Sequence, residues 1–260
     1  MAADYEYFVE QIKANTGIDL AQYKEAQMLR RLTTLREKRG YKDFKAYFQA
    51  IRSDEALMDE FLDRMTINVS EFYRNYQRWE VLERRILPEL LKKKKPLKIW
   101  SAACSTGEEP YTLAILLDRY AKGTAFTIHA TDLDQRVLEK AKIGKYNERA
   151  LKEMPAAIKS AYFTQEGPIF QIKEELKQHI QFKQHNLLAD AYDTNYDLII
   201  CRNVLIYFTE EAKADIYHKF SKSLAHRGYL FVGSTEQIFN PNNYGLGAVD
   251  TFFYQKQKAD

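Results

Sequence analysis

The chain has 260 residues, 45% of them hydrophobic, and carries a formal net charge of +3. This apolar content is ordinary for a globular protein with a buried core, and the charge is too small to indicate a nucleic-acid partner by itself. Two distant cysteines without metal spacing, no apolar run of membrane-spanning length and no signal-peptide core in residues 1–20 predict a reduced, cytoplasmic protein without direct membrane insertion.

The first 66 residues are predicted to form a small helical domain, because no stretch alternates polar and apolar residues as a strand would. Gly17 and Gly40 suit the ends of helices. Apolar residues recur at helical spacing in residues 5–12, 28–35, 44–51 and 57–65. A further helix is predicted from Phe72 to Leu91, closed by the lysine run of residues 92–95, where cations suit the helix dipole.

After Pro96 short apolar strands alternate with helices, which is the pattern of an α/β domain with a doubly wound, mostly parallel sheet. Residues 160–183 interrupt the alternation, so a small β-subdomain is expected there, inserted in a second domain of residues 67–260. The segment 248–256 is expected to return antiparallel at the end of the sheet. Strands are expected at residues 98–100, 126–132, 180–184, 196–200 and 228–234, with helices at 111–120, 135–144 and 210–224.

Ligands of open α/β sheets lie beyond the carboxyl ends of the strands, so the segments that follow the strands are expected to meet in one crevice. These segments are SAACSTGEEP (101–110), ATDLD (130–134), HNLLAD (185–190) and CRNVLIYF (201–208).

The first of these segments indicates the kind of cofactor. It has a single glycine, Gly107, followed by Glu108 and Glu109. A dinucleotide needs a glycine-rich loop against its pyrophosphate, which two carboxylates would repel. They suit a cofactor that is cationic at this point and lacks phosphates, as S-adenosylmethionine is. The alternative is that the glutamates only favour the helix N-terminus.

Asp132 ends a predicted strand 25 residues after Gly107, where an acidic residue can accept hydrogen bonds from both ribose hydroxyls. The alternative is an N-cap of the helix predicted at residues 135–144. For Asp134 the capping role is preferred, and ribose binding is the alternative.

Five ordered segments resemble the bacterial chemotaxis receptor methyltransferase family, CheR, over nearly the whole chain. They are MTINVSEFYR (65–74), SAACSTGEEPYTLA (101–114), ATDLDQRVLEKA (130–141), HNLL (185–188) and CRNVLIYF (201–208). The resemblance implies a helical N-terminal substrate-recognition domain and a Rossmann-like domain that binds S-adenosylmethionine and its product S-adenosylhomocysteine. It also implies transfer of methyl groups to glutamate side chains of chemoreceptors for sensory adaptation.

The resemblance also implies a set of site residues. Glu108 is expected to bind the amino group of the cofactor and Asp132 its ribose. Arg202 and Tyr207 are expected beside the transferred methyl group. Cofactor contacts are expected at Asn68, Ser70, Arg74, Glu108, Asp132, Asn186, Leu187, Arg202 and Asn203.

A glutamate nucleophile constrains the chemistry. Its carboxylate is already ionised at pH 7, so no general base is needed, and catalysis is expected to come from alignment and desolvation. Arg202 is expected to orient that carboxylate with its bidentate fork and Tyr207 to line the methyl site. The alternatives are a buried salt bridge for Arg202, to Asp132 or a helix end, and a core aromatic for Tyr207.

Residues 30–45 carry seven basic and two acidic side chains. At 100° per residue, Arg30, Arg31 and Lys38 lie off the apolar stripe of their helix. Together with Arg36 they are predicted to dock the acidic cytoplasmic helical domain of the receptors. A solvated face without a partner is the alternative.

The sequence is also compatible with other functions. A nucleic-acid methyltransferase is the nearest, but CRNVLIY stands where enzymes that methylate base nitrogens carry N-P-P-Y or D-P-P-Y. An oxidoreductase using NAD fits the sheet but not the first segment, and a non-catalytic domain that senses the cofactor is a further alternative. The five histidines lack paired ligand spacing, so no metal is expected. We expect a monomer recruited to membrane-bound receptor arrays, with no nucleic-acid partner.

Overall fold

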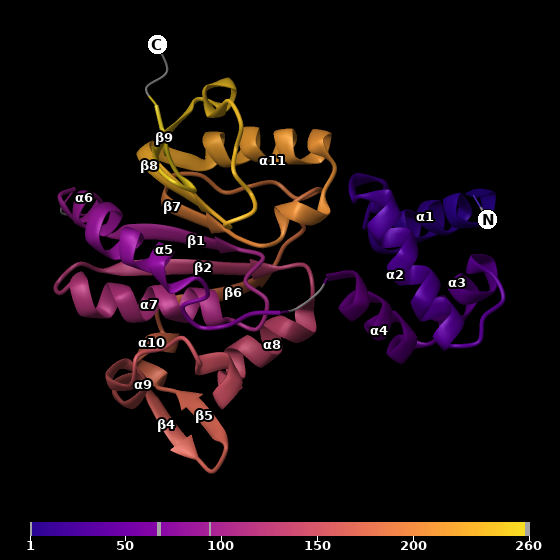
Figure 1. Ribbon diagram of the computed structural model, residues 1–260, viewed down its shortest axis with the longest axis horizontal. Helices are drawn as coiled ribbons and strands as arrows, with labels where there is room; N and C mark the ends of the chain where they lie inside the picture. The colour runs from indigo at the N-terminus through magenta and orange to yellow at the C-terminus, as the bar shows by residue number, and fades with distance from the viewer. Residues whose placement is uncertain (1, 67–68, 94, 258–260) are drawn as a thin grey trace.

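The computed structural model describes residues 2–66, 69–93 and 95–257. A group of N-terminal helices stands beside a larger α/β part (Figure 1). The four helices predicted there are confirmed, with a 3₁₀ turn between the first two. Their bounds are α1 Ala2–Thr16, η1 Leu20–Gln22, α2 Glu25–Lys38, α3 Phe44–Ser53 and α4 Glu55–Thr66. Among the described residues, no helix combines the length and apolarity needed to cross a membrane.

The helix predicted over residues 72–91 begins four residues later than expected. α5 (Tyr76–Val81) starts after Asn75, because Tyr73 and Asn75 have left-handed backbones, with φ of 54° and 60°. The helix then widens into a π turn, η2 (Leu82–Ile86), and continues as α6 (Leu87–Leu91). Pro88 accounts for the widening, because it has no N–H to donate to the preceding turn.

The predicted doubly wound sheet is confirmed. Seven strands lie in the order β6-β2-β1-β7-β8-β10-β9, and the five from β6 to β8 are parallel. Its strands are β1 Leu97–Ala102, β2 Phe126–Asp132, β6 Ile180–Gln184, β7 Tyr196–Cys201, β8 Leu224–Val232, β9 Leu246–Asp250 and β10 Phe253–Lys256. The helices around it include α7 Glu108–Tyr120, α8 Gln135–Ile143 and α11 Glu210–Ser223, and a 3₁₀ turn, η5, covers Pro241–Tyr244.

The last segment returns antiparallel at the end of the sheet, as predicted, with β10 paired to β8, but it forms parts of two strands rather than one. It is the greater part of a hairpin of two strands, β9 and β10, that pair antiparallel across a turn at Thr251 and Phe252. Phe252 has a φ of 68°, which a continuous strand does not allow.

Alternate residues of the central strands enter two cores, as a period of two requires. Ile99 and Ile200 pack in one cluster with Leu113 of α7. Trp100 and Ile199 pack in the other with Phe220 of α11. α7 and α11 therefore cover opposite faces of the sheet (Figure 1). The second cluster continues into the N-terminal helices.

The small β-subdomain is present with other bounds than the predicted 160–183. A three-stranded antiparallel sheet, in the order β3-β5-β4, projects below the main sheet in Figure 1. Residues 180–183 are not part of it, because Ile180 begins β6 and pairs with Ile128 of β2. The subdomain includes β3 Lys145–Asn147, η3 Glu148–Leu151, α9 Ala156–Tyr162, β4 Phe163–Glu166, β5 Ile169–Ile172 and α10 Glu174–Lys177. Its first strand escaped prediction because three residues show no periodicity.

The N-terminal helices contact the α/β part through the backbone as well as through the shared core. Tyr23 and Phe208 form an antiparallel bridge. Beside it the Lys24 N–H donates to the Tyr207 carbonyl at 2.8 Å, and the Thr209 N–H donates to the Gln22 carbonyl at 2.9 Å. The segment before α2 is thus fixed to the segment that follows β7.

Candidate functional site

A pocket lies at the carboxyl ends of the parallel strands, beside the point between β1 and β7 where the strand order reverses. It contains about 930 Å³ of empty space, partly open to solvent. The predicted convergence is confirmed, since all four strand-end segments line it. They contribute Ala103, Cys104, Ser105, Glu109, Asp132, Leu133, His185, Asn186, Leu187, Arg202, Asn203, Val204, Tyr207 and Phe208.

The loop after β1 takes left-handed conformations largely without glycine. Ala103 and Ser105 have φ of 60° and 49°, and only Gly107, at 94°, is a residue that adopts them freely. A Cβ on Gly107 would also lie 2.8 Å from the Cβ of Ala141 in α8. Hydrogen bonds hold the loop, because the Cys104 N–H donates to the Thr131 carbonyl at 2.9 Å. The single glycine is thus required by close packing against α8.

Asp132 and Asp134 divide the two roles weighed from the sequence. Asp134 caps α8, accepting the Arg136 N–H at 2.9 Å. Asp132 lines the pocket, and its two oxygens accept the N–H groups of Ser105 at 2.8 Å and Asp134 at 3.0 Å. Burial raises the Asp132 pKa to about 6. Each oxygen can accept a second hydrogen bond, so the carboxylate is available to two hydroxyls.

Glu108 and Glu109 differ from the prediction, because Glu109 rather than Glu108 lines the pocket. Glu108 is buried, and the Thr106 hydroxyl donates to its carboxylate at 2.7 Å. Burial raises its pKa, while hydrogen bonds from Thr106 and Ser70 lower it. Glu109 accepts the Ser101 hydroxyl at 2.8 Å, and burial raises its pKa to about 7. Adjacent residues of a helix point 100° apart, so one of the two faces away from the ligand.

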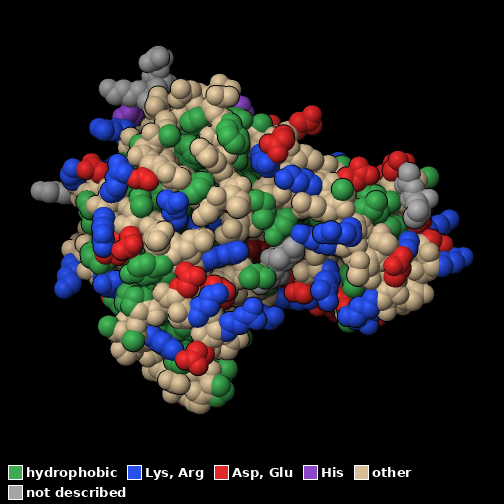
Figure 2. Space-filling model, viewed as in Figure 1, with side chains coloured by type: hydrophobic (Ala, Val, Ile, Leu, Met, Phe, Trp, Pro, Cys, Tyr) green, Lys and Arg blue, Asp and Glu red, His purple; other side chains and the backbone are tan. Residues whose placement is uncertain are grey.

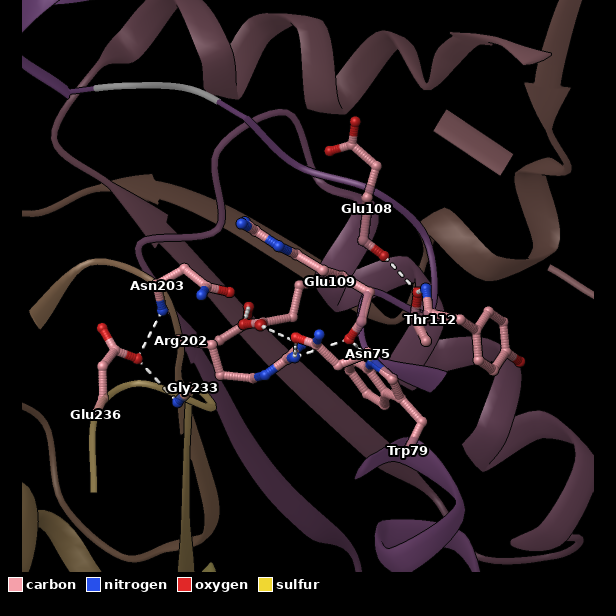
Figure 3. Close-up of polar contacts among 12 residues, drawn as sticks. Asn75, Trp79, Glu108, Glu109, Thr112, Arg202, Asn203, Gly233 and Glu236 are labelled. Carbon is pink, nitrogen blue, oxygen red and sulfur yellow. Dashed lines mark hydrogen bonds and ion pairs between the residues drawn. The ribbon is translucent and has the colours of Figure 1, made fainter. Parts of the chain in front are cut away.

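Arg202 does not present a free fork to a substrate, which corrects the predicted bidentate role. One terminal nitrogen lies 3.6 Å from the Glu109 carboxylate. The other donates to the Arg74 carbonyl at 2.7 Å and to the side-chain oxygen of Asn75 at 3.1 Å (Figure 3). Its guanidinium also lies over the rings of Trp79 and Phe231, 5.4 and 4.8 Å from their centroids. The structure thus has a buried ion pair at Arg202, as the alternative supposed, but its partner is Glu109 in the first turn of α7 rather than Asp132.

Tyr207 lies in the 3₁₀ turn η4 (Leu205–Tyr207) and lines the pocket half-buried. The Arg31 guanidinium lies 4.9 Å from its ring centroid, and a terminal nitrogen of Arg31 donates to the Met65 carbonyl at 3.4 Å. Tyr23, also from the N-terminal part, lines the pocket as well. Sequence reasoning did not assign Tyr23 to the site, since nothing local distinguishes it from a core aromatic.

The remaining predicted cofactor contacts also fall at the pocket, with one exception. Ser70 and Arg74 line it, and a terminal nitrogen of Arg74 donates to the Val69 carbonyl at 3.0 Å. Asn186 accepts the Leu188 N–H at 2.9 Å, while Leu187 is buried against the pocket. Asn68 lies outside the described residues.

A second groove, which we call the basic groove, adjoins the pocket. Val69 lines both cavities. Lys and Arg side chains lie on the surface where the N-terminal helices meet the α/β part (Figure 2). The basic groove is lined by Arg30, Arg31, Thr34, Leu35, Lys38, Asp63, Arg64 and Val69. Three of the four predicted docking residues are among these, and Arg64 was not predicted. Arg36 is not, because its guanidinium packs 4.9 Å from the Phe44 ring centroid between α2 and α3.

The pocket suits a phosphate-free nucleoside with a cationic tail. Three buried polar atoms of its lining residues have no hydrogen-bond partner within the described chain, namely Ser105 Oγ, His185 Nδ1 and Arg202 Nε. Glu109 and Asp132 add carboxylates for an ammonium group and for hydroxyls. Residues 2–66, 69–93 and 95–257 contain no group of three or more His, Cys, Asp or Glu able to hold a metal ion.

Sheet order, helices on both faces and a pocket at the switch point define a Rossmann-like α/β domain for a nucleoside cofactor. Residues 68–251 match the family described as CheR methyltransferase, SAM binding domain, and residues 3–66 match CheR methyltransferase, all-alpha domain. The chain therefore belongs to the CheR methyltransferase family, and its cofactor is S-adenosylmethionine, as predicted.

Relatives along the whole chain agree with this assignment. The chain is 45% identical to chemotaxis protein methyltransferases of Listeria monocytogenes and Listeria innocua, covering 97% of each chain. It is 36% identical to chemotaxis protein methyltransferase 1 of Pseudomonas aeruginosa, covering 94% of each chain.

Proposed function

We propose that this methyltransferase esterifies glutamate side chains in the cytoplasmic helical domain of chemoreceptors. The observation that carries the proposal is that the basic groove and the cofactor pocket share a lining residue, Val69. A helix lying in the groove could direct one of its carboxylates into the pocket. The four cations of the groove, against the single carboxylate of Asp63, favour an acidic helix.

We assign the cofactor contacts as follows. Asp132 accepts the ribose hydroxyls, and Glu109, in place of the Glu108 predicted from the sequence, attracts the cationic tail. Arg202 keeps Glu109 partly ionised, because its charge opposes the rise in the Glu109 pKa. Ser70, Arg74, Asn186, Leu187 and Asn203 complete the binding site.

The methyl transfer needs little from the protein beyond position and exclusion of water. When bound, S-adenosylmethionine would supply the methyl group of its sulfonium to a carboxylate oxygen and leave as S-adenosylhomocysteine. A substrate glutamate is already ionised at pH 7, which fits a pocket whose only lining histidine, His185, has its pKa lowered by burial. Tyr207 and the Arg31 guanidinium over its ring are the groups we assign to orienting the incoming carboxylate.

We further propose that residues 1–66 form the substrate-recognition domain and residues 67–260 the methyltransferase domain. The protein would act as a monomer in the cytoplasm and be recruited to membrane-bound receptor arrays by the basic groove.

The test is methyl transfer from labelled S-adenosylmethionine to chemoreceptor-containing membranes, followed by mild alkali. We expect label on a receptor-sized band that alkali releases as methanol, because carboxyl methyl esters are labile and methylated amines are not. Alkali-stable label, label on nucleic acid, or no label with cofactor binding intact would each overturn the proposal.

A further inference from the structure

Glu236 is a buried carboxylate that the chemistry above does not use. It follows β8, is 5% exposed, and is absent from the described lining of the cofactor pocket. Its side chain faces the turn after β7 (Figure 3). Oε2 accepts the N–H groups of Asn203 at 2.7 Å and Gly233 at 2.8 Å, and Oε1 accepts the Ile206 N–H at 3.3 Å. One side chain thus joins the ends of two neighbouring strands.

The turn that Glu236 holds carries three of the residues assigned to the site. Arg202, Asn203 and Tyr207 all line the pocket, and Asn203 has a left-handed backbone with φ of 62°. Such a backbone persists only where its surroundings hold it. Its N–H is partly buried and needs an acceptor, and Glu236 is that acceptor.

We propose that Glu236 is a positioning residue for methyl transfer: it holds the turn of residues 202–207 so that Asn203 and Tyr207 face the cofactor and the incoming carboxylate. It acts through the backbone of that turn and contacts neither reactant. This inference rests on the proposed roles of Asn203 and Tyr207.

Gly233 provides independent support from the other side of the contact. A Cβ on Gly233 would lie 2.2 Å from the Glu236 Oε2 and 2.9 Å from the Asn203 nitrogen. Gly233 does not have a positive φ, so its backbone conformation is compatible with alanine. The added Cβ would nevertheless clash with the Glu236 carboxylate. Gly233→Ala therefore displaces the same carboxylate without altering its chemistry.

The main variant is Glu236→Gln, which keeps the shape of the side chain. The amide of glutamine has only one oxygen, so its NH₂ group must face at least one of the backbone N–H groups that the carboxylate now accepts. That N–H group then loses its acceptor. We expect kcat to fall about 10- to 100-fold, the range that small misalignment of reacting groups produces. The affinity for S-adenosylhomocysteine, which Asp132 and Glu109 also bind, should weaken less than kcat falls.

Asp197→Asn is the matched control. Asp197 lies in β7 at the end opposite the site, is fully buried, and accepts the Lys98 N–H at 3.2 Å. Like Glu236→Gln, it exchanges a buried carboxylate for an amide. It should lower Tm while leaving kcat and KM at wild-type values, when rates are compared at temperatures where both variants are folded.

The double variant separates positioning from general damage. If Gly233→Ala and Glu236→Gln disturb one contact, their effects on kcat should overlap rather than multiply. A kcat of Glu236→Gln equal to that of Asp197→Asn, or effects that multiply, would overturn the inference. Failure of the wild-type protein to methylate receptor carboxylates would instead remove the proposed function on which it rests.

Discussion

Val69 lines both the cofactor pocket and the basic groove, but the two sites differ in how far their charged side chains are buried. In the pocket Arg202 and Asp132 are 6% and 7% exposed, and each has defined partners. In the groove Arg30 and Lys38 are exposed. A buried charge that loses its partner costs several kcal/mol, whereas an exposed pair contributes about 1 kcal/mol or less. A single substitution of a charged residue should therefore have a large effect in the pocket. In the groove each substitution should have a small effect, and several together should add up.

The largest effect is expected from Arg202→Ala, which leaves Glu109 buried without its cation and removes two hydrogen bonds. We expect a loss of about 3–5 kcal/mol in the free energy of unfolding. Urea denaturation measures it. Replacing both partners, as Arg202→Met with Glu109→Gln, should recover part of the loss. A loss below about 1 kcal/mol for Arg202→Ala would mean that the Arg202–Glu109 pair stabilises the protein no more than an exposed ion pair does.

Next in size is the contrast between Asp132→Ala and Asp134→Ala. The first removes the acceptor that we propose for two ribose hydroxyls and should weaken cofactor affinity at least about 100-fold, since hydrogen bonds to charged groups contribute about 1.5–3 kcal/mol each. The second removes only the cap of α8 and should cost about 1 kcal/mol of stability. Calorimetric titration with S-adenosylhomocysteine measures the first, and thermal unfolding the second. Equal affinities for the two variants would contradict the division of roles.

A tenfold effect is expected from pH. Burial raises the Glu109 pKa to about 7, opposed by Arg202 and Arg74 and reinforced by Glu236. In the proposed site the cationic tail of the cofactor binds the ionised carboxylate of Glu109, and the ionised fraction rises as pH passes upward through the pKa. Affinity for S-adenosylmethionine should therefore increase about tenfold between about pH 6 and about pH 8. Glu109→Gln should remove most of that slope, and an unchanged slope would assign it to another group.

The smallest effect is expected in the groove. Lys38→Glu should raise KM for the receptor about threefold at low salt and leave cofactor affinity unchanged, because exposed charges act mainly on encounter. Lys42→Glu is the control, since Lys42 is exposed but lies outside the groove. Arg31→Glu should act more strongly than Lys38→Glu, because Arg31 also contacts the Tyr207 ring and the Met65 carbonyl. Similar values for Lys38→Glu and Lys42→Glu would argue against docking in this groove.

Local pattern was sufficient for much of the fold and for the position of the site. The 3.6-residue period predicted the four N-terminal helices, and alternation of short strands with helices predicted the parallel sheet. The rule that strand ends converge predicted that Asp132, Asn186 and Arg202 lie at one pocket, as they do. The elements depend on residues close in sequence, and the convergence of strand ends follows once those elements form a parallel sheet, so the sequence by itself determined both.

Only the tertiary structure decided which neighbour of a pair faces the ligand and which partner each charge takes. Glu109 rather than Glu108 lines the pocket, because the rotation of α7 about its axis turns only one of two adjacent residues toward it. Arg202 pairs with Glu109, Arg36 packs on Phe44, and Glu236 reaches Asn203 across 33 positions of chain. No sequence spacing encodes such contacts, because they form between elements that are separate in sequence. Buried polar groups need hydrogen-bond partners, and the packing of the elements decides which partner is close enough.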